Sequence, residues 1–402
     1  MPTGMTVYSH ALRFACALSL TIAVIVPACA DNSLTDAMVS RSQVSLGDTD
    51  RLDRVFAKAL RGEPVTIGFI GGSITRGSGA SAPDKNYAAL LAAWWQRQFP
   101  ASSIKVVNAG VNGTSSIYGA LRASRDLLAH NPDFVVVEFA VNDGWQDEYA
   151  ESYEGLLRQI LSQPNAPAAL ALFMMWANGG NMQDMQAKIG RHYGLPMVSF
   201  RDAFWPEMKS GRLKWSDYIV DEVHPNDAGH EAIALFIEKL LEKHLAFDEA
   251  RKTQSALAAL PAPLRPTRFE STLLAEASGL NPIHNFGWVR SGRGEWTNFW
   301  TGTQPGARIA FQFSGAGIVL SYLKGRGMGK VQACIDGKQI TEIDAGVETP
   351  WGLIREFRVI GAVSENSVHT IELELIGGKS ADAKEFGLLS LGSIGLSRES
   401  GR

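Results

Sequence analysis

An apolar run near the start of the chain, Val65-Thr66-Ile67-Gly68-Phe69-Ile70, leads without a break into Gly71-Gly72-Ser73-Ile74-Thr75. Apolar side chains on both faces of so short a run predict a strand buried on both sides, as in a parallel sheet covered by helices. The serine then stands on the turn that leaves the carboxyl end of the strand, where open α/β sheets bind ligands. The glycines before it allow a sharp turn and a close approach by another group.

The same pattern repeats along the next part of the chain. Four further buried strands are predicted over residues 104–108, 134–139, 170–175 and 197–200. Segments with the apolar period of a helix lie between and after them, at 87–99, 117–130, 148–162, 182–193 and 228–244. Strand followed by helix, repeated in this way, predicts a three-layer, doubly wound parallel sheet of the flavodoxin-like type.

The pattern changes near residues 256–267, which are rich in alanine and then in proline. Pro261, Pro263 and Pro266 lie too close together for a helix or a central strand. Beyond them the apolar period becomes two, in runs such as 308–313, 318–323 and 369–376. We therefore expect an α/β domain over 31–255, a linker over 256–267 and an all-β, jelly-roll-like sandwich over 268–402.

Composition agrees with a globular protein of two domains. The chain has 402 residues, of which 45% are hydrophobic and 20% charged, and this length exceeds what one core usually organises. The formal net charge is -3, and no long run of Lys or Arg occurs. Because nucleic-acid binding needs a basic surface, we expect no nucleic-acid partner. No feature of the sequence specifies an oligomeric state.

The first thirty residues have the pattern of an export signal. Arg13 precedes the apolar run 14–26, which is followed by Ala28-Cys29-Ala30. This predicts a signal peptide over 1–30, cleaved after Ala30, and a periplasmic or extracellular location. The run is shorter than the roughly 20 residues that span a bilayer, so no membrane span is expected. A second interpretation is a lipoprotein, with a lipid anchor at Cys29.

A serine hydroxyl is a weak nucleophile at neutral pH and needs a neighbouring base. His224 lies in Asp221-Glu222-Val223-His224-Pro225-Asn226, just before the last predicted helix of the α/β domain. In a turn, Asp221 can reach the second ring nitrogen of His224 and select its tautomer. The segment also admits a simpler interpretation, an acidic loop whose Asn226 or Asp227 caps the helix.

Acyl transfer develops negative charge on an oxygen, so hydrogen-bond donors must converge on that atom. Two candidates follow the second and third predicted strands: the backbone N–H of Gly113 and the side-chain amide of Asn142. Each could equally be an ordinary turn residue or helix cap.

Taken together, the four segments resemble the SGNH (GDSL-like) hydrolases, in which a serine, a glycine, an asparagine and a histidine fall in four blocks in this order. The resemblance covers roughly residues 64–246. It implies that Ser73 is the nucleophile and an oxyanion donor, that Gly113 and Asn142 are further donors, and that His224 is the base oriented by Asp221. Such an enzyme is an exported serine esterase that uses neither a metal nor a cofactor.

Two positions depart from the family pattern. Gly72 stands where the name-giving motif has Asp, and Ala140 stands where the third block usually has Gly. The variant Gly-Gly-Ser-Ile-Thr is associated with bacterial members that act on carbohydrate esters. The resemblance therefore implies an acylated carbohydrate, or another small ester, as substrate, and we expect the enzyme to deacetylate O-acetylated polysaccharides or oligosaccharides.

Other functions remain open at the level of sequence. The same residues would serve a lipolytic esterase or thioesterase acting on longer acyl chains, or an acetyltransferase. A non-catalytic carbohydrate-binding protein is a further alternative. The second domain holds Trp288, Trp296, Trp300 and Trp351, whose rings could stack on sugars or form its core.

Overall fold

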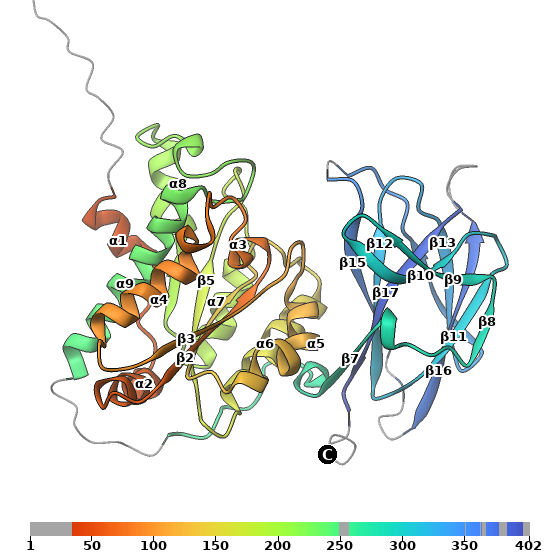
Figure 1. The fold of residues 1–402 in the computed structure, drawn as a ribbon, viewed down its shortest axis with the longest axis horizontal. Helices are drawn as coiled ribbons and strands as arrows, with labels where there is room; N and C mark the ends of the chain where they lie inside the picture. Colours follow the sequence, from red (N-terminus) through yellow and green to blue (C-terminus); the bar gives the residue numbers. More distant parts are fainter. Residues whose placement is uncertain are drawn as a thin grey trace, which may run out of the picture.

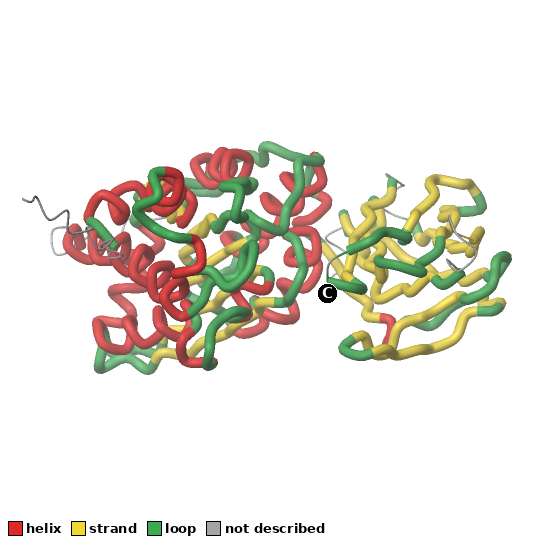
Figure 2. Tube along the Cα trace, turned by 90° about the horizontal axis from the view of Figure 1, so that it is seen from above, coloured by secondary structure: helices red, strands yellow, loops and turns green. Residues whose placement is uncertain are grey.

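The computed structural model describes residues 34–248, 257–349, 351–361, 363, 367–377 and 384–396. The predicted signal peptide lies outside these residues. Helices and a central sheet make up the first domain, whereas strands dominate the second (Figures 1 and 2). The predicted fold class, an α/β domain followed by an all-β domain, is confirmed.

The sheet of the first domain has six strands in the order β1-β6-β5-β4-β2-β3. Its five parallel strands are β2 (Val65–Gly71), β3 (Ile104–Gly110), β4 (Phe134–Glu138), β5 (Ala168–Phe173) and β6 (Met197–Ser199). The sixth strand, β1 (Gln43–Ser45), pairs antiparallel with β6 at one edge. β1 was not predicted from the sequence, because three residues are too few to show an apolar period.

Helices cover both faces of this sheet (Figure 1). One face packs on α1 (Asp36–Ser42), α2 (Asp50–Leu60), α4 (Tyr87–Gln98), α8 (Phe200–Lys209) and α9 (Asp227–Asp248). The other face packs on α5 (Ser116–Asp126), α6 (Asp147–Leu161) and α7 (Gln183–His192). Neighbouring strand residues such as Val136 and Val137 enter opposite cores, as the alternation of side chains along a strand requires. Within the described residues, none of the helices has both the length and the apolar character to span a bilayer.

The second domain is a sandwich of two antiparallel sheets. The first sheet has the order β15-β12-β17-β10-β9 with β7 also on β17, and the second has the order β14-β13-β16-β11-β8. The strands are β7 (Thr272–Glu276), β8 (His284–Phe286), β9 (Trp288–Arg293), β10 (Trp296–Gly302), β11 (Arg308–Ser314), β12 (Gly317–Lys324), β13 (Lys330–Ile335), β14 (Lys338–Asp344), β15 (Ile354–Ile360), β16 (Val368–Gly377) and β17 (Phe386–Ile394). Trp288 and Trp300 are part of the core, whereas Trp351 is 60% exposed.

The two domains are joined by a packed interface on α5 and α6. The ring of Phe357 stacks on Tyr118 with 5.4 Å between centroids, and the Arg355 guanidinium lies 4.6 Å from the centroid of the Tyr118 ring. Arg268 donates two hydrogen bonds to the buried carboxylate of Glu151. The sandwich therefore contacts α5, the helix that begins just after the loop containing Gly113.

The end of the predicted linker also packs on the first domain. The Leu264 N–H donates to the buried Glu154 carboxylate, and the Ala262 carbonyl lies 2.7 Å from a ring nitrogen of His192. These contacts hold the segment along α6 and α7.

Candidate active site

Ser73 is the first residue of the short helix α3 (Ser73–Arg76), directly after β2. The turn before it is tightly packed. A Cβ on Gly71 would lie 2.2 Å from Thr75 Oγ1 and 2.6 Å from the Glu138 carbonyl oxygen, so no larger residue fits at Gly71. Ser73 thus lies at the carboxyl end of the parallel sheet, as predicted from the sequence.

The loop before α9 brings His224 to this serine. His224 Nε2 lies 2.8 Å from Ser73 Oγ, and His224 Nδ1 lies 2.6 Å from Asp221 Oδ2. The other oxygen of Asp221 accepts the backbone N–H groups of Val223 and His224, at 2.8 Å each. The carboxylate therefore shapes the turn that presents the imidazole. Asn226 also caps α9, since its Oδ1 accepts the Gly229 N–H, so the two interpretations of this segment coexist.

The protonation states of Asp221 and His224 follow from the hydrogen bonds that these side chains make. Partial burial acts to raise the pKa of Asp221, but hydrogen bonds from the His224 ring and from the N–H groups of His224 and Val223 hold that pKa below its usual range. An ionised Asp221 only accepts, so Nδ1 of His224 carries the hydrogen. The lone pair on Nε2 then faces the Ser73 hydroxyl, which is the arrangement needed to remove its proton.

Asn142 and Gly113 lie on the loops that leave β4 and β3 at the same edge of the sheet. Asn142 packs against the turn before Ser73, because a Cβ on Gly72 would lie 2.4 Å from Asn142 Oδ1. Glycine at the position where the family motif has Asp therefore makes room for Asn142. Gly113 has φ of +63°, a left-handed conformation that favours glycine. Its loop is joined to β2 by the bond from the Val111 N–H to the Gly71 carbonyl oxygen, 3.1 Å long.

Comparison with known proteins gives the family. A model of the GDSL-like lipase/acylhydrolase family matches residues 69–232. Over 185 residues the chain is 30% identical to thioesterase 1/protease 1/lysophospholipase L1 of Escherichia coli (strain K12), a match that spans 44% of this chain and 83% of that protein. The chain belongs to this family. It is therefore an SGNH-type carboxylic ester hydrolase, and the resemblance inferred from the sequence is confirmed.

Three further matches concern esterases of acetylated polysaccharides. The esterase is 28% identical over 200 residues to an acetylxylan esterase of Geobacillus stearothermophilus, covering 41% of this chain and 89% of that one. It also matches the crystal structure of a two-domain esterase (CEX) active on acetylated mannans, with a TM-score of 0.80 and 33% identity over 89% of this chain and 99% of that chain. A crystal structure of CEX with mannopentaose matches with a TM-score of 0.79 and 32% identity. The likeness to CEX thus covers both domains.

Arg122 and Asp143 organise this edge of the sheet and were not predicted from the sequence. The fully buried guanidinium of Arg122 donates to the carbonyl oxygens of Gly71 (3.1 Å) and Ala109 (2.6 Å), near the ends of β2 and β3. The carboxyl of Asp143 accepts the Ser116 N–H and the Gln186 amide, which links the Asn142 loop to the start of α5. Asp143 adjoins Asn142 in the sequence and could have been considered, whereas nothing around Arg122 marks it.

His230 joins three elements behind the catalytic edge and was also missed. Its Nδ1 accepts the Tyr87 N–H at the start of α4, and its Nε2 donates to the Ser78 carbonyl oxygen beyond α3, at 3.3 Å each. The ring is fully buried and stacks on the Tyr87 ring, with centroids 6.2 Å apart. Burial lowers the pKa of His230 to about 4.

His230 should make the fold sensitive to acid. A histidine in the unfolded chain binds its proton near pH 6.5, whereas folded His230 stays neutral to about pH 4. Between these values the unfolded state binds more protons, so the free energy of unfolding falls as the pH falls, by up to about 3 kcal/mol from this residue. Urea unfolding from pH 7 to pH 4.5 should show a shallower decline for His230→Asn than for the unmodified enzyme. The exposed His130, changed to Asn, is the control; equal declines for all three proteins would contradict this account.

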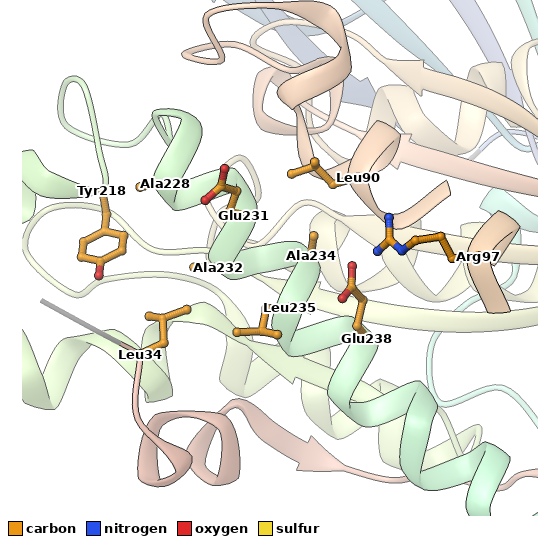
Figure 3. A pocket seen from close by; sticks show the side chains of 10 residues that line it. All are labelled: Leu34, Leu90, Arg97, Tyr218, Ala228, Glu231, Ala232, Ala234, Leu235 and Glu238. Carbon is orange, nitrogen blue, oxygen red and sulfur yellow. The ribbon is translucent and has the colours of Figure 1, made fainter. Parts of the chain in front are cut away.

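A groove with a volume of about 450 Å³ lies between α4 and α9, apart from the residues described above (Figure 3). Leu90 and Arg97 of α4 face Leu235 and Glu238 of α9 across it. None of the five residues predicted from the sequence lines this groove, so it has no evident part in ester hydrolysis.

Proposed function

We propose that this esterase removes acetyl groups from O-acetylated polysaccharides or oligosaccharides through an acyl-enzyme on Ser73. The observation that carries the proposal is the hydrogen-bonded line from Ser73 Oγ through His224 to Asp221. It gives a serine, a base and an orienting carboxylate in the relation that nucleophilic catalysis needs.

The reaction then proceeds in two halves. Ser73 Oγ attacks the ester carbonyl carbon while its proton passes to His224 Nε2, and the resulting oxyanion accepts hydrogen bonds from the N–H groups of Ser73 and Gly113 and from Asn142 Nδ2. The bond to the sugar oxygen breaks, and His224 returns the proton to that oxygen. Water, deprotonated by His224, attacks the acyl-enzyme in the same way, and acetate leaves.

Aromatic side chains near Asn142 support a sugar substrate. Trp176 Nε1 donates a hydrogen bond to the carbonyl oxygen of Val141, the residue before Asn142. The centroids of the Trp176 ring and of the Trp351 ring in the second domain are 6.5 Å apart. Trp145, three residues after Asn142, is 80% exposed. Exposed tryptophans offer flat apolar faces on which sugar rings can pack. Since CEX shares both domains with this esterase and acts on acetylated mannans, acetylated mannan is the first candidate.

The direct test is acetate release from acetylated mannan, xylan, pectin and peptidoglycan, with Ser73→Ala as the blank. The proposal expects release from at least one polysaccharide, with mannan fastest. Activity on small aryl esters without release from any of the four would contradict it.

Trp351→Ala should weaken the use of polymeric substrate. Loss of one aromatic stacking face weakens the free energy of substrate binding by about 1 kcal/mol. The KM for acetylated mannan oligosaccharides should therefore rise roughly 3- to 10-fold. The kcat for phenyl acetate, which is too small to span both domains, should stay close to that of the unmodified enzyme. Phe286→Ala is a matched control, because Phe286 is a 66% exposed aromatic residue on β8 of the same domain. Equal KM values for the two variants would remove Trp351 from substrate binding.

Activity on longer acyl chains is the second candidate, favoured by the match to the Escherichia coli thioesterase and lysophospholipase. Acetyl, butyryl and octanoyl 4-nitrophenyl esters separate the two functions. An acetylesterase loses kcat/KM as the chain lengthens, whereas a lipolytic enzyme gains it.

We further propose that the enzyme is exported to the periplasm or beyond the cell. The apolar run 14–26 and the Ala28-Cys29-Ala30 that follows it support this. The amino terminus of the mature protein tests it: Asp31 indicates cleavage after Ala30, and a lipid-modified Cys29 indicates a lipoprotein.

A further inference from the structure

A carboxyl group that the reaction above does not use lies beneath the turn of Ser73. Glu138 is the last residue of β4, between Gly71 of β2 and Leu172 of β5 in the sheet, and none of it is exposed. Carboxyl groups are rarely buried so completely without a partner charge. The burial of Glu138 beside the nucleophile therefore needs a functional explanation.

Glu138 contacts both ends of the turn that carries the nucleophile. Its Oε2 accepts the Thr75 hydroxyl at 3.3 Å, and the backbone N–H of Gly72 is near enough to the carboxyl to favour its charged form. The Thr75 hydroxyl lies in turn 2.9 Å from the Tyr87 hydroxyl. One side chain thus lies against the turn both before Ser73, at Gly72, and after it, at Thr75.

Two buried oxygens near this turn lack partners among the described residues. They are Oε1 of Glu138 and Oδ1 of Asn142. Both side chains adjoin Gly72: its N–H is near enough to the carboxyl of Glu138 to influence its pKa, and a Cβ on it would lie 2.4 Å from Asn142 Oδ1. Two acceptors cannot satisfy each other, but a protonated carboxyl is a donor. A proton on Glu138 would serve both oxygens.

The surroundings favour the neutral form of Glu138. Burial raises the pKa of Glu138 to about 8, and the nearby Asp143 adds to the rise, although hydrogen bonds from Thr75 and Gly72 oppose it. The other titratable groups that face it are the buried phenols of Tyr87 and Tyr153. Burial also raises the pKa of Asp143, but each of its two oxygens accepts a hydrogen bond, Oδ1 from the Ser116 N–H and Oδ2 from the Gln186 amide, whereas Oε1 of Glu138 has no donor among the described residues. Of the two carboxyls, Asp143 is therefore the better place for a negative charge, and Glu138 is the better place for the proton.

We propose that neutral Glu138 is a positioning residue for this active site, one that anchors the turn of Ser73 and donates a hydrogen bond to Asn142 Oδ1. With Oδ1 occupied in this way, the Nδ2 group of Asn142 is directed toward the oxyanion. Ionisation of Glu138 removes this donor and places a negative charge close to the developing oxyanion, so the rate falls. The inference rests on the proposed function of Ser73 and Asn142.

The test compares Glu138→Gln with Glu138→Ala by phenyl acetate hydrolysis in a pH-stat between pH 6 and pH 9.5. Glutamine is neutral at every pH, and it can accept from Thr75 and donate to Asn142. The unmodified enzyme is expected to lose activity above about pH 8, where Glu138 ionises. Glu138→Gln should keep kcat at pH 7 within about threefold and should not show this decline. Glu138→Ala should lose roughly 10- to 100-fold in kcat, with KM nearly unchanged, because the oxyanion donor is no longer oriented.

Glu154→Gln is the matched control, since Glu154 is another buried glutamate, on α6, which bonds to Tyr193 and Leu264 away from Ser73. It should leave the pH profile unchanged. If Glu138→Gln keeps the alkaline decline, or loses as much kcat as Glu138→Ala, the neutral-donor role is wrong. Reaction of a fluorophosphonate with Ser73 in every variant shows that Ser73 is still a reactive nucleophile. Failure of this inference can therefore be distinguished from failure of the proposed function. If Glu138→Ala does not fold, the profile of Glu138→Gln decides alone.

Discussion

Ser73→Ala is expected to lower kcat for phenyl acetate by roughly 10⁴- to 10⁶-fold while leaving the fold intact. Ser73 Oγ lies 2.8 Å from His224 Nε2, and without this oxygen no acyl-enzyme forms. The alanine loses one oxygen on a turn whose packing depends on Gly71 and Thr75, so thermal unfolding should change little.

Steady-state assays of acetate release from phenyl acetate measure this fall in kcat. Ser124→Ala is a suitable control, because Ser124 is exposed on α5. Turnover by Ser73→Ala within tenfold of the unmodified enzyme would mean that another group attacks the ester.

Asn142→Ala should have the second largest effect, a loss of about 10² to 10³ in kcat, the usual effect of removing one oxyanion donor. The side chain packs on Gly72 beside the nucleophile, where its amide contributes most in the transition state. Since the ground state gains little from that amide, KM should change much less than kcat.

The comparison of kcat with KM on phenyl acetate checks this. Asn165→Ala is the control. Asn165 follows α6, and its amide donates a hydrogen bond to the Pro132 carbonyl oxygen, away from Ser73. A rise in KM at constant kcat would assign Asn142 to substrate binding and not to the oxyanion.

The parts of the fold that follow from local pattern could be predicted from the sequence. The run from Val65 to Ser73 contains a buried strand and its turn within a few residues, so its form depends little on distant contacts. The same is true of the other parallel strands and of the helix that follows His224. By contrast, β1 consists of three residues held at the edge only by β6, and no local pattern marks it.

In the active site too, the residues marked by a local sequence pattern were predicted, and those that depend on contacts between distant elements were not. Ser73 and His224 are 151 residues apart in the chain. Their pairing was inferred because Ser73 follows a strand end, because the loop of His224 before the last helix can return to that edge of the sheet, and because the motifs resemble a known family. Glu138 and Arg122 were not found, since their roles depend on other elements: Glu138 accepts the Thr75 hydroxyl, and Arg122 donates to the Gly71 carbonyl oxygen. The proximity of Trp351 to Trp176 depends on how the two domains pack, and composition carries no information about that.

The central claim is that Ser73 is the nucleophile, activated by His224. Incubation with a fluorophosphonate, followed by intact mass measurement and peptide mapping, tests it most directly, because the reagent forms a stable bond only to an activated serine as fluoride leaves. The account predicts one adduct per chain, on Ser73, strongly slowed in His224→Ala and absent in Ser73→Ala. An adduct on another serine, or labelling of Ser73 at the same rate without His224, would contradict it.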